Sequence, residues 1–328
     1  MTLRIILILI GFSIGTVLAS PSCGQQPECP NCFVPLVMRN AQGELAHDYS
    51  PKDVTVKIDG IPVAVDEIHG EQRLRRIVIV LDASGSMKDS WRHAVSSGSI
   101  VASLAEGHAR LALLIFNDKV VEQIGFDRGN SAVEERLKDL QNNGEFAKTS
   151  VHGGSAINDA IASAIVLLVD PTTADSIYVV SDGHDNKSHT DQWDIKQKLS
   201  ASGIRVFADV LRQWNGSGRV YQSELLGTGP DFQDLAQLTG GASIQADPTE
   251  TKLSFPVRPK SSVIEAAHLF FAAMFDNEVL QFSWTNLGTN KRDMKISISE
   301  TGKDHVPGMQ LFYPRQLYAC ASKVVPAH

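Results

Sequence analysis

Three oxygen-bearing side chains occupy alternate positions in residues 77–91, IVIVLDASGSMKDSW. Asp82, Ser84 and Ser86 follow a run of strand-forming residues, and Gly85 between the serines permits a sharp turn. On an irregular loop the carboxylate and the two hydroxyls can converge on one point. Such donors suit a hard, six-coordinate ion such as Mg²⁺, which favours oxygen and keeps waters, better than they suit zinc. The spacing therefore predicts a metal site that needs further ligands from elsewhere in the chain.

Two later segments carry side chains that could complete this site. Ser155 lies in the glycine-rich loop HGGSAINDA, just before an apolar helix, and Asp182 ends the apolar run in VVSDGHDN. Ligands of open α/β sheets bind beyond the carboxyl ends of the strands, and Asp82 and Asp182 each occupy such an end. We therefore expect one metal site made from Asp82, Ser84, Ser86, Ser155 and Asp182.

The same residues allow two other interpretations. Ser84 and Ser86 could simply cap the following helix. A serine could also act as a nucleophile beside His152 or His184, whose loops are expected to surround the site, although both histidines could equally be ordinary surface residues. The segment DASGS is not the Gly-x-Ser-x-Gly turn of hydrolases. The sequence therefore favours a binding protein over an enzyme, and Asp185 is expected to stabilise its loop more than to bind the metal.

Apolar runs alternate with helical patterns over about residues 73–250. The runs are continuous, as in strands that are buried on both faces of a parallel sheet, and the segments between them repeat apolar residues at helical spacing. This alternation predicts a doubly wound, mostly parallel α/β domain. The expected buried strands are residues 77–81, 110–117, 120–126, 176–182 and 204–211, with a last edge strand at 242–247.

The two chain ends differ from this central domain. Residues 20–72 contain a strand and a hairpin signal at Asp59-Gly60, and residues 251–328 contain an apolar helix at 261–275 followed by strands. Both ends are β-rich and both carry cysteines. We therefore expect one smaller β module, built from both ends, into which the α/β domain is inserted.

The first 19 residues have the pattern of a signal peptide. Arg4 precedes a short apolar stretch, and residues 17–19, Val-Leu-Ala, fit the small-residue rule of a cleavage site. The apolar residues 5–18 are too few to span a bilayer comfortably as an uncleaved anchor, and residues 20–22 form a poor lipobox for a lipoprotein cut before Cys23. We expect an exported mature chain, in the periplasm, the cell envelope or the extracellular space.

Export gives the four cysteines a structural meaning. Cys23, Cys29 and Cys32 lie near the mature N-terminus and Cys320 near the C-terminus, and an even number in an exported protein indicates disulfides. The alternatives are redox chemistry of the CPNC segment, which needs a helix start that is absent here, and a zinc site made from all four thiols. If both ends share one module, Cys32–Cys320 with Cys23–Cys29 is the first pairing to expect.

Composition and charge limit the class of partner. The 328 residues, 43% hydrophobic and 20% charged, leave room for one large core and a smaller companion. The formal net charge is −7 and no basic run occurs. Nucleic acids and anionic membranes need clustered lysine and arginine, so the sequence argues against both.

The three oxygen-bearing segments together resemble the von Willebrand factor type A (VWA) domain and its metal-ion-dependent adhesion site, over about residues 76–246. That site uses a DxSxS loop, a threonine from a second loop and an aspartate from a third. Asp82, Ser84 and Ser86 match the first element and Asp182 the third, whereas Ser155 stands where the family has threonine. Serine keeps the hydroxyl but lacks the methyl that restricts its rotamer. The flanks also resemble exported bacterial VWA-related proteins.

The resemblance implies a bound Mg²⁺ ion, or Mn²⁺ or Ca²⁺ in its place, held directly by the three serines and through water by the two aspartates. It also implies a protein partner whose Asp or Glu carboxylate replaces one of the waters. Loops around the site would select this partner. The candidate segments are Lys148, His152, residues 118–119 and residues 184–190, with His152, His184 and Asp185 as the named candidates.

Two functions of different classes remain open at this point. One is metal-dependent protein recognition, as in adhesion, and the other is a structural role in an envelope assembly, where the metal only orders loops. Chelation separates them, because only the first loses partner binding in EDTA. Two Asn-x-Ser sequons, which begin at Asn186 and Asn215, are treated as chance matches.

Overall fold

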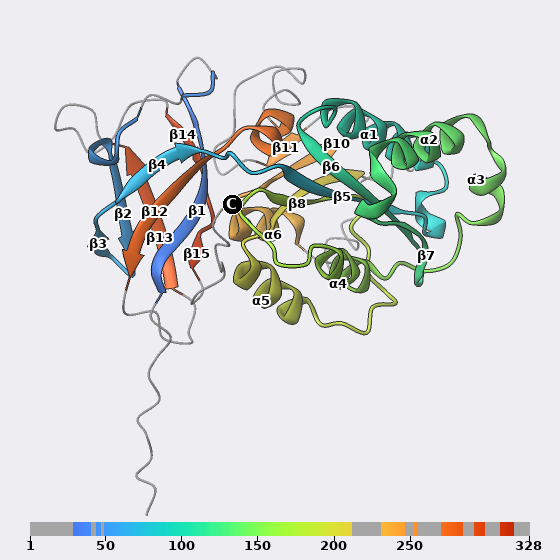
Figure 1. Ribbon diagram of the computed structural model, residues 1–328. Coiled ribbons are helices and arrows are strands. Elements are labelled where there is room, and N and C mark those ends of the chain that lie inside the picture. Colours follow the sequence, from blue (N-terminus) through green and yellow to red (C-terminus); the bar gives the residue numbers. More distant parts are fainter. Residues whose placement is uncertain are drawn as a thin grey trace, which may run out of the picture.

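Two parts make up the described chain, an α/β domain and a smaller β-rich module (Figure 1). The computed structural model describes residues 29–40, 44–46, 49–211, 231–246, 252–254, 270–284, 292–298 and 309–317. The signal-peptide prediction and the predictions for Cys23 and Cys320 fall outside these residues. Within them, no helix is both long enough and apolar enough to cross a membrane.

A seven-stranded sheet forms the centre of the α/β domain, in the order β11-β10-β9-β8-β5-β6-β7. The five inner strands run parallel, and β7 and β11 pair antiparallel at the two edges. The prediction of a doubly wound, mostly parallel sheet is therefore confirmed. The strands are β5 (Arg75–Asp82), β6 (Ala109–Phe116), β7 (Val120–Ile124), β8 (Asp175–Ser181), β9 (Arg205–Leu211), β10 (Ala242–Ala246) and β11 (Lys252–Ser254).

Helices cover both faces of this sheet (Figure 1). One face carries α1 (Trp91–Leu104) and α2 (Gly129–Asn142), and the other carries α4 (Ile157–Leu167), α5 (Gln192–Ser202) and α6 (Phe232–Thr239). The short helices α3 (Glu145–Thr149), η2 (Gly85–Met87) and η3 (Phe126–Arg128) lie in the connections between the larger elements.

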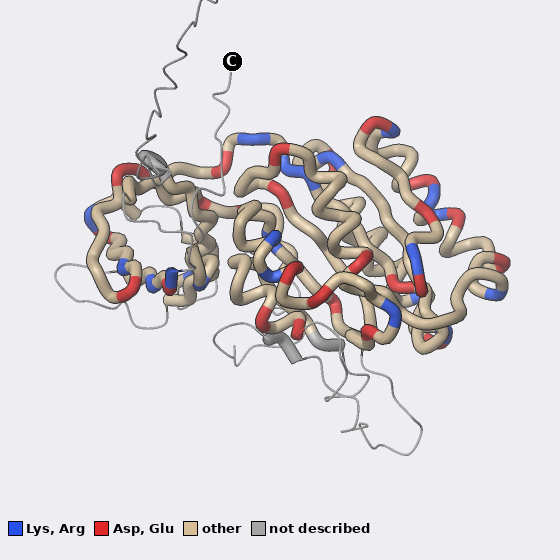
Figure 2. Tube along the Cα trace, turned by 90° about the horizontal axis from the view of Figure 1, so that it is seen from below, with Lys and Arg blue, Asp and Glu red and all other residues tan. Residues whose placement is uncertain are grey.

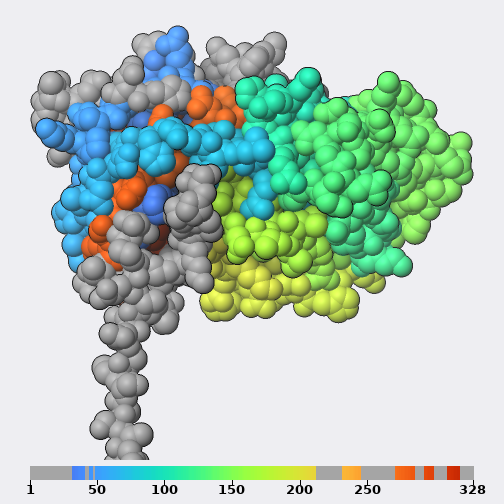
Figure 3. All heavy atoms as spheres, viewed as in Figure 1, coloured from blue at the N-terminus to red at the C-terminus, as the bar shows by residue number. Residues whose placement is uncertain are grey.

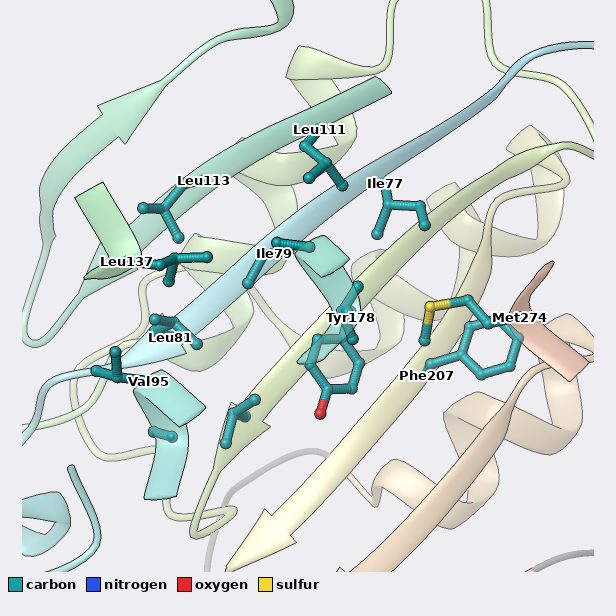
Figure 4. Packing of buried hydrophobic residues seen from close by; sticks show 14 of the residues in the cluster. Ile77, Ile79, Leu81, Val95, Leu111, Leu113, Leu137, Tyr178, Phe207 and Met274 are labelled. Carbon is teal, nitrogen blue, oxygen red and sulfur yellow. The ribbon is translucent and has the colours of Figure 1, made fainter. Parts of the chain in front are cut away.

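The alternation of side chains along the strands builds two apolar cores. In β5, Ile77, Ile79 and Leu81 face α1 and α2, whereas Val78 and Val80 face α4 and α5. Figure 4 shows the first core, where side chains from neighbouring strands lie side by side beneath α1 and α2. Burial of each such side chain contributes about 1.5–3 kcal/mol, so the carboxyl ends of the strands are held in fixed register.

The edges of the sheet differ from the sequence-based expectations. The run at residues 120–126 predicts a buried strand, but β7 is an edge strand whose residues alternate between partly covered and exposed. Residues 242–247 predict an edge strand, but β11 pairs with the outer side of β10. The sheet therefore extends past the expected domain boundary at residue 250.

The described end of the predicted helix at 261–275 also belongs with the α/β domain. The sequence analysis groups this helix with the C-terminal segment, which is expected to share a module with the N-terminal β segment. Instead, Phe270 makes edge-to-face contacts with Tyr178 and Phe207, with ring centroids 6.0 and 5.7 Å apart, and Met274 lies in the same core. The aromatic side chains of Tyr178 in β8 and Phe207 in β9 thus provide the apolar surface on which Phe270 packs.

The β module contains two four-stranded sheets with strands from both chain ends. Their orders are β14-β1-β12-β4 and β15-β13-β2-β3, and a shared core of side chains from both ends holds them together. The predicted insertion of the α/β domain into this module is confirmed, and Figure 3 shows the blue and orange atoms of the two ends intermixed beside the α/β domain. The strands are β1 (Cys29–Arg39), β2 (Val54–Ile58), β3 (Ile61–Val63), β4 (Glu67–Gly70), β12 (Glu278–Trp284), β13 (Arg292–Ile298), β14 (Gln310–Phe312) and β15 (Gln316–Leu317), with η1 (Pro51–Asp53) before β2.

The predicted hairpin at Asp59-Gly60 joins β2 to β3. Both residues have positive φ, +49° and +81°, as a two-residue hairpin turn with the twist of its strands requires.

Two chain crossings between the parts lie side by side. The Glu71 amide donates to the Asn277 carbonyl at 3.0 Å, and the Arg75 guanidinium donates to the Asn277 side chain at 3.3 Å. The predicted boundary between residues 72 and 73 falls in the first of these crossings, between β4 and β5.

Cys32 is a free, buried thiol, so the expected Cys32–Cys320 bridge is not formed in the structure. Its side chain is 6% exposed and belongs to the core between the two β sheets, as do those of Val34 and Leu36. The position of Cys32 next to the expected strand from Phe33 predicts a bridge, but alternate residues of β1 share the inward face, and Cys32 lies on that face.

Candidate metal site

The first loop of the candidate site begins where β5 ends. Asp82 is 0% exposed, and its Oδ1 accepts a hydrogen bond of 2.8 Å from the Ser84 amide. This bond turns the chain, so that the Ser84 and Ser86 hydroxyls lie 3.1 Å apart. Ser84 is buried and Ser86 is exposed. The DxSxS spacing thus places one carboxylate and two hydroxyls together, as the sequence predicts.

The second loop brings Ser155 to the same carboxylate. The Ser155 hydroxyl donates to Asp82 Oδ2 at 3.0 Å. Two backbone hydrogen bonds fix this loop against the first: the Gly85 amide donates to the Gly153 carbonyl, and the His152 amide donates to the Ala83 carbonyl, each at 3.0 Å. Backbone hydrogen bonds therefore hold the two loops together without a bound ligand.

Glycine is required where these two loops meet. A Cβ on Gly85 would lie 3.2 Å from the Gly153 carbonyl oxygen, and Gly153 itself has a φ of +82°. A larger residue at either position would push the loops apart or strain the backbone.

The third loop begins at the end of β8 and contributes Asp182. This residue is half-buried, and its Oδ1 accepts a hydrogen bond of 3.1 Å from the His184 amide. Its charge acts on Asp82, because it raises the pKa of that carboxyl group. All five predicted ligands therefore belong to one cluster at the carboxyl edge of the sheet.

Ser181 is a member of this cluster that the sequence analysis missed. Its hydroxyl donates to Asp82 Oδ2 at 2.6 Å and accepts from the Gly183 amide at 3.0 Å. The residue is the last of an apolar run, and only its hydroxyl within that run could have indicated a role. Ser181 fixes the rotamer of the Asp82 carboxylate from the side of β8.

Burial governs the electrostatics of Asp82. Removal from water and the negative charge of Asp182 both raise the pKa of its carboxyl group, and the hydrogen bonds from Ser181 and Ser84 lower it. The net effect is a rise from 3.8 to about 6. None of these groups is a cation. A buried carboxylate that lacks a positive partner is costly, and a bound cation would supply that partner.

The chemistry of the donors fits Mg²⁺. Two carboxylates and several hydroxyls form a hard, oxygen-only set, which suits an ion that retains part of its water shell. Within the described residues, no three His, Cys, Asp or Glu side chains gather to hold a metal. The described part of the chain thus offers no such cluster for a softer ion such as zinc, and a metal held at this place would need the hydroxyl groups as ligands.

The predicted partner-contact residues lie in different environments. His152 is exposed on the second loop and His184 is half-buried on the third. Asp185, in contrast, is only 6% exposed, and its carboxylate accepts hydrogen bonds of 3.0 Å from the Asn158 and Ser188 amides. Partner contact by Asp185 does not agree with this burial, whereas a loop-stabilising role does.

Comparison with known proteins gives one family match. Residues 60–210, just under half of the chain, match the family described as VWA domain containing CoxE-like protein. This range includes all three loops of the site. No curated protein matches the chain.

Three solved structures are similar to parts of the fold. They are the conserved hypothetical protein BatB from Bacteroides thetaiotaomicron (14% identity, TM-score 0.40, 61% of this chain and 98% of that chain), the human COPII-coat protein Sec24c (8%, 0.39, 74% and 43%) and a von Willebrand factor type A protein from Catenulispora acidiphila (14%, 0.34, 93% and 77%). At these TM-scores the three similarities carry no argument about function. It is the family match over residues 60–210, on the doubly wound sheet described above, that identifies a VWA-like domain in this chain.

Proposed function

We propose that the chain is a binding protein that captures a protein partner through a Mg²⁺ ion at the carboxyl edge of its sheet. The observation that carries this proposal is the buried Asp82 carboxylate, which the Ser155 and Ser181 hydroxyls contact at 3.0 and 2.6 Å. The pKa of this carboxyl group is raised to about 6, mainly by burial, so its ionised form is destabilised at neutral pH unless a cation lies beside it. Mn²⁺ or Ca²⁺ could take the place of Mg²⁺, since both also prefer oxygen donors.

The roles of the residues follow from their charges. Ser84, Ser86 and Ser155 would provide neutral hydroxyl ligands, and Asp82 and Asp182 would hold water at the ion. Because the direct ligands are neutral, the bound ion would retain enough positive charge to attract a carboxylate from an Asp or Glu of a partner. We infer binding without catalysis, and the exposed His152 and half-buried His184 beside the ion would help to select the partner.

The distribution of charge supports a protein as the partner. Figure 2 shows acidic and basic residues interspersed along the described chain, without an extended basic stretch. With a net charge of −7, the surface offers little to the phosphates of a nucleic acid. The N-terminal signal pattern adds the expectation that the partner lies beyond the cytoplasmic membrane.

The alternative is that the metal only orders the loops of a structural envelope component. The loops are already joined by the backbone hydrogen bonds between Gly85 and Gly153 and between His152 and Ala83. This preorganisation leaves less ordering for an ion to do, and it supports the recognition role.

A pull-down from envelope extract tests the proposal. The wild-type protein should retain a partner in Mg²⁺ and release it in EDTA. Asp82→Asn should retain none in either buffer, while Asp194→Asn, which removes an exposed charge from α5, should behave as the wild type. Retention that is equal in Mg²⁺ and EDTA would support the structural alternative.

A further inference from the structure

The backbone of Ser155 is held by the residue pair that follows Asp185. The Ser155 amide donates to Asn186 Oδ1 at 3.0 Å. The Ser155 carbonyl accepts from the Asn186 and Lys187 amides, also at 3.0 Å each. The third loop thus satisfies both backbone polar groups of the second-loop ligand, and the Asn186 side chain supplies one of these bonds.

The rest of the third loop is anchored to the start of α4, which follows Ser155. The buried Asp185 carboxylate accepts from the Asn158 amide in the first turn of α4. In return, the Asp159 carboxylate accepts from the His189 and Thr190 amides at 3.0 and 2.8 Å. Partial burial raises the pKa of Asp159, but hydrogen bonds from the side chains and backbone amides of Thr190 and His189 outweigh it and lower the pKa to about 2. Asn186 therefore sits in a segment that is fixed at both of its ends.

Gly154 allows this close approach. A Cβ at position 154 would lie 2.5 Å from Asn186 Oδ1 and 2.5 Å from Lys187 Cγ. The absence of a side chain there lets the asparagine reach the amide of the next residue. The Gly-Gly-Ser segment and the Asn186 side chain are thus complementary in shape.

We propose that Asn186 is a positioning residue for metal binding, which acts through Ser155. Its amide oxygen fixes the peptide plane from which the Ser155 side chain extends toward Asp82. This inference rests on the proposed function for its metal, but the positioning itself is a property of the metal-free chain. Residues that orient the ligands of a metal commonly change its affinity by 10–100-fold when they are replaced.

Calorimetry on four variants measures the effect on Mg²⁺ binding. Asn186→Ala should weaken Mg²⁺ binding by about tenfold and leave the midpoint of thermal unfolding within a few degrees. Asn142→Ala, at an exposed asparagine near the end of α2, serves as the matched control and should bind as the wild type. In a Ser155→Ala background the Asn186→Ala substitution should cost no further affinity, because a residue that acts through Ser155 has nothing left to position.

Amide exchange on the metal-free protein gives a second readout that needs no ion. The Ser155 amide should exchange at least about tenfold faster in Asn186→Ala than in the wild type, because its acceptor is gone. Asn186→Asp, which keeps an oxygen at the same place, should restore the protection. The added charge of this aspartate attracts cations by itself, so its rescue is judged by exchange and not by affinity.

The outcomes separate this inference from the proposed function. If the wild type and Asp82→Asn bind Mg²⁺ equally, or if neither binds, the proposed function fails. The inference about metal binding by way of Asn186 then fails too, and the exchange data cannot rescue it. Suppose instead that the wild type binds Mg²⁺ and Asp82→Asn does not. The inference alone is then overturned if Asn186→Ala binds Mg²⁺ as tightly as the wild type. It is also overturned if the affinity lost in Asn186→Ala adds in full to the affinity lost in Ser155→Ala. Unchanged exchange of the Ser155 amide in Asn186→Ala would also overturn it.

Discussion

The Ser155 hydroxyl donates a hydrogen bond of 3.0 Å to Asp82 Oδ2, although the two residues are 73 positions apart in the chain. The contact joins the end of β5 to the loop before α4. Ser155 lies in the loop between α3 and α4, and the neighbouring Ala156 amide donates to the Asn117 carbonyl, just after β6, at 2.8 Å. Because β6 is the parallel neighbour of β5, this hydrogen bond holds the loop beside the end of β5. The candidate metal-binding donors are therefore brought together by the fold although they lie far apart in the sequence.

Ser155→Thr should hold Mg²⁺ at least as tightly as the wild type. The added methyl restricts χ1 and reduces the freedom that the hydroxyl loses on binding. Titration calorimetry on both proteins measures the effect. A clear loss of affinity would mean that Ser155 is not a ligand, or that its buried pocket has no room for a methyl group.

In the metal-free protein, the contribution of Asp82 to the free energy of unfolding should become more favourable as the pH falls from 7 toward 4. Its folded-state pKa of about 6 lies above the ordinary 3.8, so the folded state binds the proton more tightly than the unfolded state does. The cost of the buried charge is fully present above pH 6 and disappears below about pH 4, which corresponds to about 3 kcal/mol.

Urea unfolding of the wild type and Asp82→Asn at several pH values isolates this contribution. The pH-dependent difference between the two proteins should shrink as the pH falls. Saturating Mg²⁺ should reverse the trend, because the positive charge of the ion, acting through its bound water, favours the ionised form of the carboxylate. Parallel pH profiles for the two metal-free proteins would contradict the assignment.

His93 should make a separate contribution, which also favours the folded state more strongly as the pH falls. Its Nε2 lies 3.4 Å from Asp209 Oδ2, and that carboxylate also accepts from Ser97, whose hydroxyl lies 2.6 Å from that of Tyr178. The contact with Asp209 raises the pKa of His93 above 6.5, against partial burial. Its stabilisation is therefore complete below pH 6.5 and is lost as the pH rises through the raised value. His93→Gln should remove this part of the stability profile, and a variant with an unaltered profile would show that the pair contributes nothing.

The sequence predicts the α/β sheet, and the clustering of Asp82, Ser84, Ser86, Ser155 and Asp182 at its edge, because both depend on local pattern. A strand that is buried on both faces reads as an apolar run, and the donors stand where such runs end. Ser181 and Asn186 were not predicted, since their roles depend on which loops meet in space. Glu122 and Gln123, two polar residues inside the run at residues 120–126, argue against complete burial of this strand, in agreement with the edge position of β7.

Cys32 should resist alkylation in the folded protein. Burial raises the pKa of its thiol to about 11, so at pH 8 the reactive thiolate is scarce, and the core covers the sulfur. Iodoacetamide should modify it only slowly before denaturation and rapidly afterwards, as followed by mass spectrometry. Non-reducing peptide mapping gives the decisive control, because a peptide that links Cys32 to Cys320 would contradict the free thiol of the structure.

Titration of Mg²⁺ into chelator-treated protein in a calorimeter shows whether a divalent cation binds at the site around Asp82. The wild type and Asp194→Asn should bind with the same affinity, because the second protein loses only an exposed charge on α5. Asp82→Asn should show no binding and yet give the circular dichroism spectrum of a folded protein. Binding of Mg²⁺ to Asp82→Asn with wild-type affinity, or no binding to the wild type, would contradict the account.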